Sequence, residues 1–254
     1  QSNKNIFFNK IDHCEINKII YVFIMNNCFI ILAGGESKRF KSNIPKPYHL
    51  YKGKPLLLHS IEKVKNYGKF NKIVLVINKK HKTYIEKLKI KGLKIVIGGR
   101  TRAESAYRGL ESVKAYNIKN VMIHDAARPN FTLKLLDKLY SELKSNDCIV
   151  PAIQTTDSIK QKLLSKVINL KRQNIYLIQT PQAFNYKKLH QLQNNKNSET
   201  TDDSSLFIRA GKKIKIIRGE IKNNKITLNS DIKSNNLIKY GLGFDVHRLV
   251  PNKK

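Results

Sequence analysis

Cysteine is scarce in this chain, and its spacing carries no signature of a cross-linked domain. The three cysteines, Cys14, Cys28 and Cys148, lie far apart and are odd in number, and no pair has CxxC spacing. Small secreted domains use closely spaced, even numbers of cysteines, so this distribution argues against a disulfide framework. A reducing cytoplasm is therefore the expected location.

Long apolar runs are also missing. No stretch of 18 apolar residues occurs, so no segment is expected to span a membrane. The segment 18–32 resembles a signal peptide, but Asn26 and Asn27 interrupt its apolar part, and it leads directly into a glycine loop. The chain does not begin with methionine, and Met25 lies just before the first convincing strand. We treat residues 1–26 as an extension, disordered or foreign to the native protein, and assign them no function.

Acidic residues are few. Asp and Glu total 18 against 49 Lys and Arg, which gives a formal net charge of +31 in 254 residues, 41% of them hydrophobic. Taken alone, this charge indicates nucleic acid, an anionic membrane or acidic ligands. However, 40 of the bases are Lys and only 9 are Arg, amid abundant Asn and Ile, so we attribute much of the lysine excess to AT-rich coding and solvated surface. The arginines are then the better markers of planar contacts with phosphate or carboxylate.

Short apolar runs alternate with helical patterns along the chain, and several runs lack polar alternation. Such runs are typical of parallel strands covered on both faces. The expected strands are 29–32, 73–77, 95–97, 121–123, 148–152 and 214–217, and the expected helices are 56–67, 82–88, 102–116, 133–143, 206–210 and 229–240. The pattern predicts an α/β fold with a doubly wound, mostly parallel sheet, whose ligands bind beyond the carboxyl ends of the strands. Residues 153–180 break the rhythm and predict a protruding β-arm.

The most informative local pattern is an apolar run that ends in two glycines and is followed by bases. Residues 29–40 read FIILAGGESKRF, and residues 45–48 read PKPY. Neither the Walker spacing GxxxxGK[ST] nor GxGxxG is present. Glycines still let backbone N–H groups approach phosphate oxygens, and Arg39 and Lys46 add positive charge. On this pattern alone, the alternative is an ordinary strand-to-helix turn with surface bases.

Further motifs make a family resemblance specific. The glycine loop and PKPY resemble the AAGxGxRM and PKxY signature of 2-C-methyl-D-erythritol 4-phosphate cytidylyltransferase. The family's GGxxRxxS resembles GGRTRAES at 98–105, and its most recognisable hexapeptide is HDAARP at 124–129. Further similar motifs are TDSIK at 156–160, Arg172 ahead of TPQ at 180–182, TDDSS at 201–205 and NNKIT at 223–227. The resemblance covers roughly residues 28–240, and the ordered set is far more specific than one motif.

The resemblance implies a function and a set of site residues. The family transfers CMP from CTP to 2-C-methyl-D-erythritol 4-phosphate and releases pyrophosphate, in the non-mevalonate isoprenoid precursor pathway, with Mg²⁺ on the triphosphate. By resemblance, Arg39 and Lys46 stabilise the transition state, while Arg172 and Lys225 hold the attacking phosphate. The implied nucleotide-binding residues are Ala33, Gly34, Gly35, Ser37, Gly99, Arg102, Ser105, Asp125 and Ala126. The implied substrate-binding residues are Arg128, Ser158 and Thr180.

The resemblance also implies an assembly. In the family's homodimer, the arm that carries Arg172 reaches the site of the partner subunit. We therefore expect a Rossmann-like nucleotidyltransferase domain over 27–240, with its arm at about 153–180, and a homodimer formed through that arm. Two roles have simpler alternatives, because Asp125 could cap a helix and Arg128 could be a surface ion-pair partner.

This sequence departs from the family pattern at a few positions. Gly34 and Ser37 replace the usual Ala and Gly, and Ser37 loses the freedom for positive φ, which predicts a less tight loop. Ser158 replaces Thr and keeps its hydroxyl, while LNSD at 228–231 lacks the usual RPED. None of these changes removes a charge expected at the reacting phosphate.

The tail, residues 241–254, contains a separate motif. GLGFDVHR at 241–248 resembles the first strand of 2-C-methyl-D-erythritol 2,4-cyclodiphosphate synthase, whose Gly-Phe-Asp-x-His supplies two zinc ligands. Asp245 and His247 would lie on one face of a strand, but a further His ligand is missing, so no complete zinc site is expected. We interpret the tail as the start of a second domain in a bifunctional fusion. An incidental DxH is the alternative.

Two other functions stay open. The first is cytidylyl transfer to another polyol phosphate, such as ribitol 5-phosphate. The tail favours the methylerythritol substrate, because the cyclodiphosphate synthase belongs to the same pathway. The second is a basic nucleic-acid-binding protein, which the lack of basic runs with interleaved aromatics disfavours.

Overall fold

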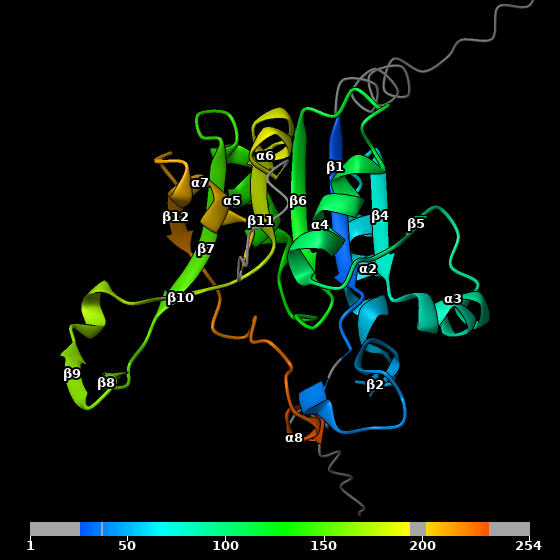
Figure 1. The fold of residues 1–254 in the computed structure, drawn as a ribbon. Helices are drawn as coiled ribbons and strands as arrows, with labels where there is room; N and C mark the ends of the chain where they lie inside the picture. The colour runs from blue at the N-terminus through cyan, green and yellow to red at the C-terminus, as the bar shows by residue number, and fades with distance from the viewer. Residues whose placement is uncertain (1–25, 37, 194–201, 234–254) are drawn as a thin grey trace, which may run out of the picture.

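A central eight-stranded sheet organises the protein (Figure 1). The computed structural model describes residues 26–36, 38–193 and 202–233. The strand order is β10-β7-β11-β6-β1-β4-β5, and β12 also pairs with β7. The strands are β1 (Asn27–Ala33), β4 (Lys72–Ile77), β5 (Lys94–Ile97), β6 (Asn120–Asp125), β7 (Cys148–Gln154), β10 (Tyr176–Ile178), β11 (Gln182–Asn185) and β12 (Lys215–Arg218).

Pairing within this sheet is mostly parallel. β1 lies parallel to both β4 and β6, β4 lies parallel to β5, and β12 lies parallel to β7. Only β10 and β11 run antiparallel to their neighbours in the sheet. The α/β class and the mostly parallel sheet predicted from the alternating pattern are confirmed.

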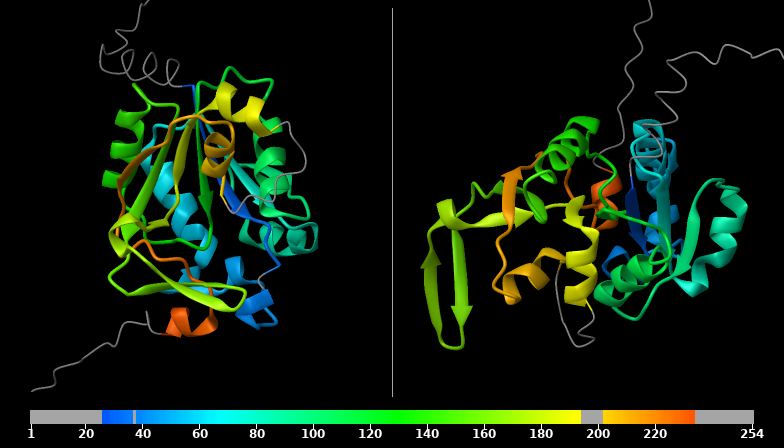
Figure 2. Two further views of the ribbon diagram at one scale, coloured as in Figure 1. Left: turned by 60° about the vertical axis from the view of Figure 1, so that its left-hand side comes forward. Right: turned by 90° about the horizontal axis from the view of Figure 1, so that it is seen from above.

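Helices cover both faces of the sheet, as the two views in Figure 2 show. The helices are α2 (Leu56–Tyr67), α3 (Lys82–Leu88), α4 (Arg102–Glu111), α5 (Leu133–Glu142), α6 (Tyr186–Gln193), α7 (Ser204–Arg209) and α8 (Asn229–Lys233). The apolar residues of α2 and α5 pack on one face, and those of α4, α6 and α7 pack on the other. Short 3-10 turns are η1 (Lys38–Phe40), η2 (Lys46–Tyr48), η3 (Lys79–His81) and η4 (Arg172–Asn174).

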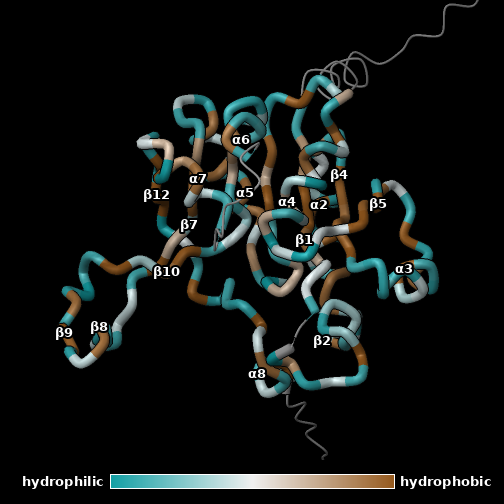
Figure 3. Tube along the Cα trace, in the orientation of Figure 1, coloured by the Kyte–Doolittle hydropathy of each residue, from teal (hydrophilic) through white to brown (hydrophobic). Residues whose placement is uncertain are grey.

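The central strand β1 shows why its sequence is continuously apolar. Phe29 and Ile31 belong to the core cluster on the α2 and α5 side, whereas Cys28 and Ile30 belong to the cluster on the α4 side. All four side chains are fully buried, because successive residues of a strand point to opposite faces and helices cover both. Figure 3 shows the same concentration of apolar residues along β1 and β4.

The predicted arm is a hairpin that projects away from the sheet (Figure 1). It consists of β8 (Ile159–Leu163) and β9 (Lys166–Leu170), and the chain returns through η4 and β10. Its tip is apolar and exposed, with Leu164 97% and Val167 63% accessible. A second small hairpin, β2 (Leu50–Tyr51) with β3 (Lys54–Pro55), lies ahead of α2.

Two local features differ from the expectation. The pattern does not predict β11, whose four residues are inserted between β6 and β7 directly after Thr180–Pro181. The helix expected over 102–116 ends at Glu111. The helix expected over 229–240 is described for Asn229–Lys233, and the rest of that range lies outside the described residues. Tertiary pairing, which no local pattern reports, decides the first of these.

Close packing of α4 against the sheet generates a stability prediction. A Cβ on Gly109 would lie 2.8 Å from Ile30 Cγ2 and 3.1 Å from Val76 Cγ2. Gly109→Ala should therefore lower the free energy of unfolding by about 1–3 kcal/mol, despite the better helix propensity of Ala. Urea denaturation measures the change, and Lys134→Ala on the exposed face of α5 is the control. Equal stability of both variants would show that α4 shifts to accept the methyl group.

Candidate active site at the carboxyl end of the sheet

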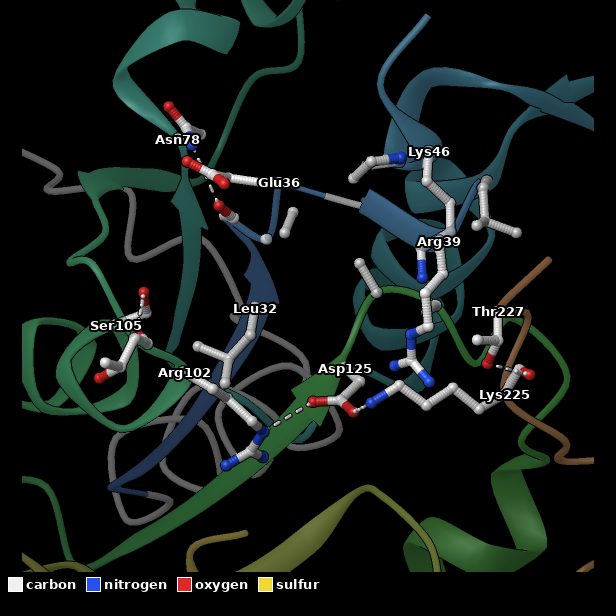
Figure 4. Close-up of a pocket in the computed structure, with 18 of the residues that line it drawn as sticks. Leu32, Glu36, Arg39, Lys46, Asn78, Arg102, Ser105, Asp125, Lys225 and Thr227 are labelled. Carbon is white, nitrogen blue, oxygen red and sulfur yellow. Dashed lines mark hydrogen bonds and ion pairs between the residues drawn. The ribbon is translucent and has the colours of Figure 1, made fainter. Parts of the chain in front are cut away.

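A pocket of about 340 Å³ lies where the carboxyl ends of β1, β4, β5 and β6 meet (Figure 4). This is the edge at which ligands bind in doubly wound sheets. Five cationic side chains and two carboxylates line it: Arg39, Lys46, Arg100, Arg102 and Lys225, with Glu36 and Asp125. The excess of three positive charges suits a polyanionic ligand.

The first wall of the pocket is the glycine loop that follows β1. Gly34 packs against the end of β4, where a Cβ would meet the Ile77 carbonyl carbon at 3.4 Å. The Asn78 side chain donates a hydrogen bond to the Gly34 carbonyl oxygen at 3.3 Å. A Cβ built on Gly35 would have no atom within 4 Å, and Gly35 lines the pocket. Ser37 lies outside the described residues, and the predicted loosening of the loop stays a prediction.

The second wall is the turn that leads from β5 into α4. Thr101 caps α4 by accepting from the Glu104 backbone N–H at 3.0 Å, and the Glu104 carboxylate accepts from the Arg100 N–H at 2.8 Å. Ser105 Oγ accepts from the Gly99 N–H at 3.1 Å. A Cβ on Gly99 would lie 2.2 Å from Glu104 Cδ, so only glycine fits this close approach.

A buried ionic cluster forms the floor of the pocket. Asp125 ends β6, and its carboxylate accepts from Arg102 Nε at 3.1 Å and from Lys225 Nζ at 2.6 Å. Arg102 also lies 2.9 Å from the carboxylate of Asp203, which is 1% exposed. Burial alone would raise the pKa of Asp125, but the two cations outweigh it and hold that pKa well below its ordinary value. Burial raises the pKa of Asp203.

The third wall brings together bases from distant parts of the chain. Lys46 Nζ donates to the Ile226 carbonyl oxygen at 3.0 Å, which joins η2 to the segment that carries Lys225. Burial, together with the charge of Lys225, lowers the pKa of Lys46. Figure 4 shows Arg39 and Lys225 on the same side of the pocket, opposite Ser105. The structure thus unites Arg39, Lys46 and Lys225, as the family resemblance implies.

Two residues with implied substrate contacts do not line this pocket. Thr180 is 5% exposed, and its hydroxyl accepts from the Asp125 N–H at 3.0 Å. Arg128 donates to the carbonyl oxygens of Asn223 at 2.9 Å and Ile178 at 3.1 Å. Both side chains therefore support the site from behind the pocket. Arg128 is not the surface ion-pair partner that the simpler alternative suggests, because its guanidinium bonds to two backbone carbonyl oxygens.

The arm residues are also apart from the pocket of their own chain. Arg172 lies on η4, where it donates to the Thr156 carbonyl oxygen at 2.9 Å, and Ser158 is exposed beside β8. Figure 1 shows the arm directed away from the carboxyl ends of β1 and β4. Within one chain, Arg172 therefore does not join Lys225.

Comparisons with known proteins identify the family of the chain. The family model of 2-C-methyl-D-erythritol 4-phosphate cytidylyltransferase matches residues 27–239. The chain belongs to this family. The bifunctional enzyme IspD/IspF of Pelagibacter ubique is 74% identical over 230 residues, which cover 91% of this chain and 62% of that protein. The cytidylyltransferase of Caldicellulosiruptor bescii is 35% identical over 213 residues, which cover 82% of this chain and 95% of that protein.

Solved structures show the same fold. The bifunctional IspDF of Campylobacter jejuni superposes with a TM-score of 0.72 at 33% identity, covering 83% of this chain and 54% of that one. The 4-diphosphocytidyl-2C-methyl-D-erythritol synthase of Anaerococcus prevotii has a TM-score of 0.73 at 29% identity, covering 83% and 96%. The chain thus spans less than two thirds of the length of its bifunctional relatives, and the cytidylyltransferase family predicted from the motifs is confirmed.

The structure adds residues to the cytidylyltransferase site that the motifs did not single out. Asp203 lies inside TDDSS, and only the fold shows its carboxylate beside Arg102. Asn78 holds the glycine loop, but an Asn after a strand reads as an ordinary turn residue. In the sequence, the signal that points to Asp203 is its position in the family motif TDDSS at 201–205.

Glu36 and Asp125 are the carboxylates that line the pocket. Within the described ranges, no three His, Cys, Asp or Glu side chains gather as a metal site. Mg²⁺ commonly binds through one or two carboxylates plus substrate phosphates, and Asp125 in the pocket fits that arrangement. Asp245 and His247, the candidate zinc ligands, lie outside the described residues.

None of the described helices has the length and apolarity needed to cross a bilayer.

His124, next to Asp125, generates a pH prediction. Burial lowers the pKa of His124 to about 3, and its neutral ring is bonded to Thr180 Oγ1 at 3.0 Å and to the Arg128 carbonyl oxygen at 3.1 Å. An unfolded histidine takes up a proton near pH 6.5, whereas the folded one does not until about pH 3. The free energy of unfolding should therefore fall by up to about 1.4 kcal/mol per pH unit as the pH decreases through this window.

Urea unfolding at a series of pH values measures this slope. His124→Gln should be less stable at neutral pH, and its unfolding free energy should depend less on pH. Parallel pH dependences in the two proteins would contradict the assignment of the slope to His124.

Proposed function

We propose that this chain transfers CMP from CTP to 2-C-methyl-D-erythritol 4-phosphate and releases pyrophosphate. The observation that carries the proposal is the pocket itself, in which five bases face two carboxylates between two glycine turns. The names of the Caldicellulosiruptor and Anaerococcus relatives, which match this domain over nearly their full length, support it. The Pelagibacter relative is bifunctional, and we include in the proposal that this domain works within such a fusion in the cytoplasm.

The chemistry joins two anions, so positioning and charge dominate. An oxygen of the acceptor phosphate attacks the α-phosphorus of CTP in line, and the bond to the pyrophosphate oxygen breaks. Negative charge increases on the α-phosphoryl oxygens in the transition state, where preorganised cations act most strongly. Arg39 on η1 and Lys46 on η2 supply these charges from the wall that they share with Lys225.

The turn over 99–105 is the proposed binding site for the base and ribose. Its backbone is held rigid by Glu104 and Ser105, so it needs little reorganisation when CTP binds. Asp125 and the backbone at Ala126 lie beside it at the end of β6. When bound, Mg²⁺ would be held by Asp125 and the triphosphate and would neutralise charge on the leaving pyrophosphate.

The acceptor phosphate is proposed to bind on the Lys225 side. Arg172 and Ser158 lie on the arm, remote from their own pocket, so they could complete the site only from a partner subunit. The exposed apolar tip of the arm at Leu164 and Val167 supports a homodimer formed through the arm.

A substrate comparison tests the proposed function. We expect CTP-dependent pyrophosphate release with 2-C-methyl-D-erythritol 4-phosphate to exceed that with ribitol 5-phosphate. Faster turnover of ribitol 5-phosphate would assign the other polyol. Tight binding of DNA at physiological salt without CTP turnover would instead favour the nucleic-acid alternative.

Lys46→Ala tests the transition-state role. Because Lys46 is expected to act on charge that develops during transfer, kcat should fall on the order of 10²–10³-fold while the Kd for CTP changes little. Steady-state kinetics and equilibrium CTP binding measure the two quantities, with Lys134→Ala as the control. Small and equal effects on kcat and Kd would contradict this role.

Mixing two inactive variants tests the arm. If Arg172 acts in the partner's site, a mixture of Arg172→Ala and Lys46→Ala subunits contains heterodimers with one intact site. Statistical exchange should then restore roughly a quarter of the wild-type sites. Activity after subunit exchange, compared with each variant alone, decides the matter. No recovery with proven exchange would place Arg172 in its own chain's function.

A further inference from the structure

Lys225 is carried by a segment without regular secondary structure. Residues 219–227, here called the strap, connect β12 to α8, and the strap residue Ile221 is 83% exposed. The Lys225 ammonium nevertheless lies 2.6 Å from the Asp125 carboxylate in the floor of the pocket. Something other than helix or strand pairing must hold the strap in place.

The buried side chain of Gln179 makes the densest set of bonds to the strap. Its Oε1 accepts from the Glu220 N–H at 3.0 Å, and its Nε2 donates to the carbonyl oxygens of Glu220 at 2.8 Å and Asn223 at 3.3 Å. Gln179 is 3% exposed and follows β10, and its backbone N–H donates to the Pro151 carbonyl oxygen at 2.8 Å. The carboxamide therefore pairs with Glu220 on both sides, as a neighbouring strand would.

The contact is reciprocal. Asn223 is fully buried, and its side chain donates to the Thr180 carbonyl oxygen at 2.9 Å. The Thr180 hydroxyl in turn accepts from the backbone N–H of Asp125 at 3.0 Å. A short bonded path thus joins Gln179 and Thr180 to the strap on one side and to Asp125, the partner of Lys225, on the other.

The strap also leaves no space for Gln179 to move. A Cβ on Gly219 would lie 2.5 Å from Gln179 Oε1 and 3.1 Å from the Ala152 carbonyl. On the far side of Lys225, the Ile226 N–H donates to the Ala127 carbonyl oxygen at 2.9 Å. Lys225 is therefore held from both sides. On the β12 side, Gln179 makes three of the bonds to the strap, and Arg128 adds one to the Asn223 carbonyl oxygen at 2.9 Å.

We infer that Gln179 is a positioning residue for the reaction, whose buried carboxamide fixes the strap so that Lys225 meets the acceptor phosphate. The inference rests on the proposed function, in which Lys225 binds that phosphate. Gln179 does not line the pocket, so it acts through Lys225 and touches neither substrate. A side chain that only stabilised the fold would not act selectively on the acceptor.

Gln179→Met separates these two roles, because methionine has a similar shape but can neither donate nor accept strong hydrogen bonds. We expect kcat/KM for the acceptor to fall on the order of 10- to 100-fold, since small displacements of a positioning group have such effects. The Kd for CTP, most of whose proposed contacts lie on the glycine loop and the turn over 99–105, should change much less than the acceptor kcat/KM. Gln191→Met on the exposed face of α6 is the matched control.

A double-mutant cycle with Lys225→Ala gives the decisive readout. If Gln179 acts through Lys225, adding Gln179→Met to Lys225→Ala should cause little further loss of acceptor kcat/KM. Additive losses, or equal weakening of CTP binding, would overturn the inference. If Gln179→Met does not fold, Gln179→Glu, which keeps the acceptor but removes both donors, enters the same cycle. A wild-type chain without turnover would instead refute the proposed function and is distinguishable from either result.

Discussion

The site depends on one buried carboxylate held between two cations. Asp125 ends the central strand β6 and is only 8% exposed, so water compensates its charge only in part. Arg102 reaches it from the first turn of α4, and Lys225 reaches it from the strap, 100 residues further along the chain. Removing one partner of such a buried set leaves an uncompensated charge, which costs several kcal/mol in typical proteins. The cluster therefore fixes two walls of the pocket relative to the sheet.

Behind this cluster, hydrogen bonds from one charged and three neutral side chains carry out the finer positioning. His124 and Thr180 hold the backbone at Asp125, while Gln179 and Arg128 hold the strap. Each of these side chains bonds to at least one backbone group, and none of them lines the pocket. The family's hexapeptide thus has a structural part as well as a chemical one, since His124 and Arg128 support Asp125 from within the core.

Arginine makes up a larger share of the bases in the pocket than of the bases in the whole chain. Lysines are 40 of the 49 basic residues of the chain, whereas three of the pocket's five bases are arginines. Arg102 shows why, because its guanidinium lies within 3.1 Å of Asp125 and 2.9 Å of Asp203 at the same time. A single ammonium has no comparable fork geometry.

Much of the fold and part of the site could be read from local sequence. Continuous apolar runs such as 29–32 and 73–77 determine buried parallel strands, and the glycines after β1 and β5 mark where a backbone must approach a ligand or neighbour. The local sequence could not predict the strand β11, the burial of the Thr180 side chain behind the pocket, or the roles of Asp203 and Gln179. Those depend on which segments, 34 to 101 residues apart in the sequence, come into contact. Hydrogen bonds and ion pairs between such distant groups form only in the folded chain, so the tertiary structure alone decided them.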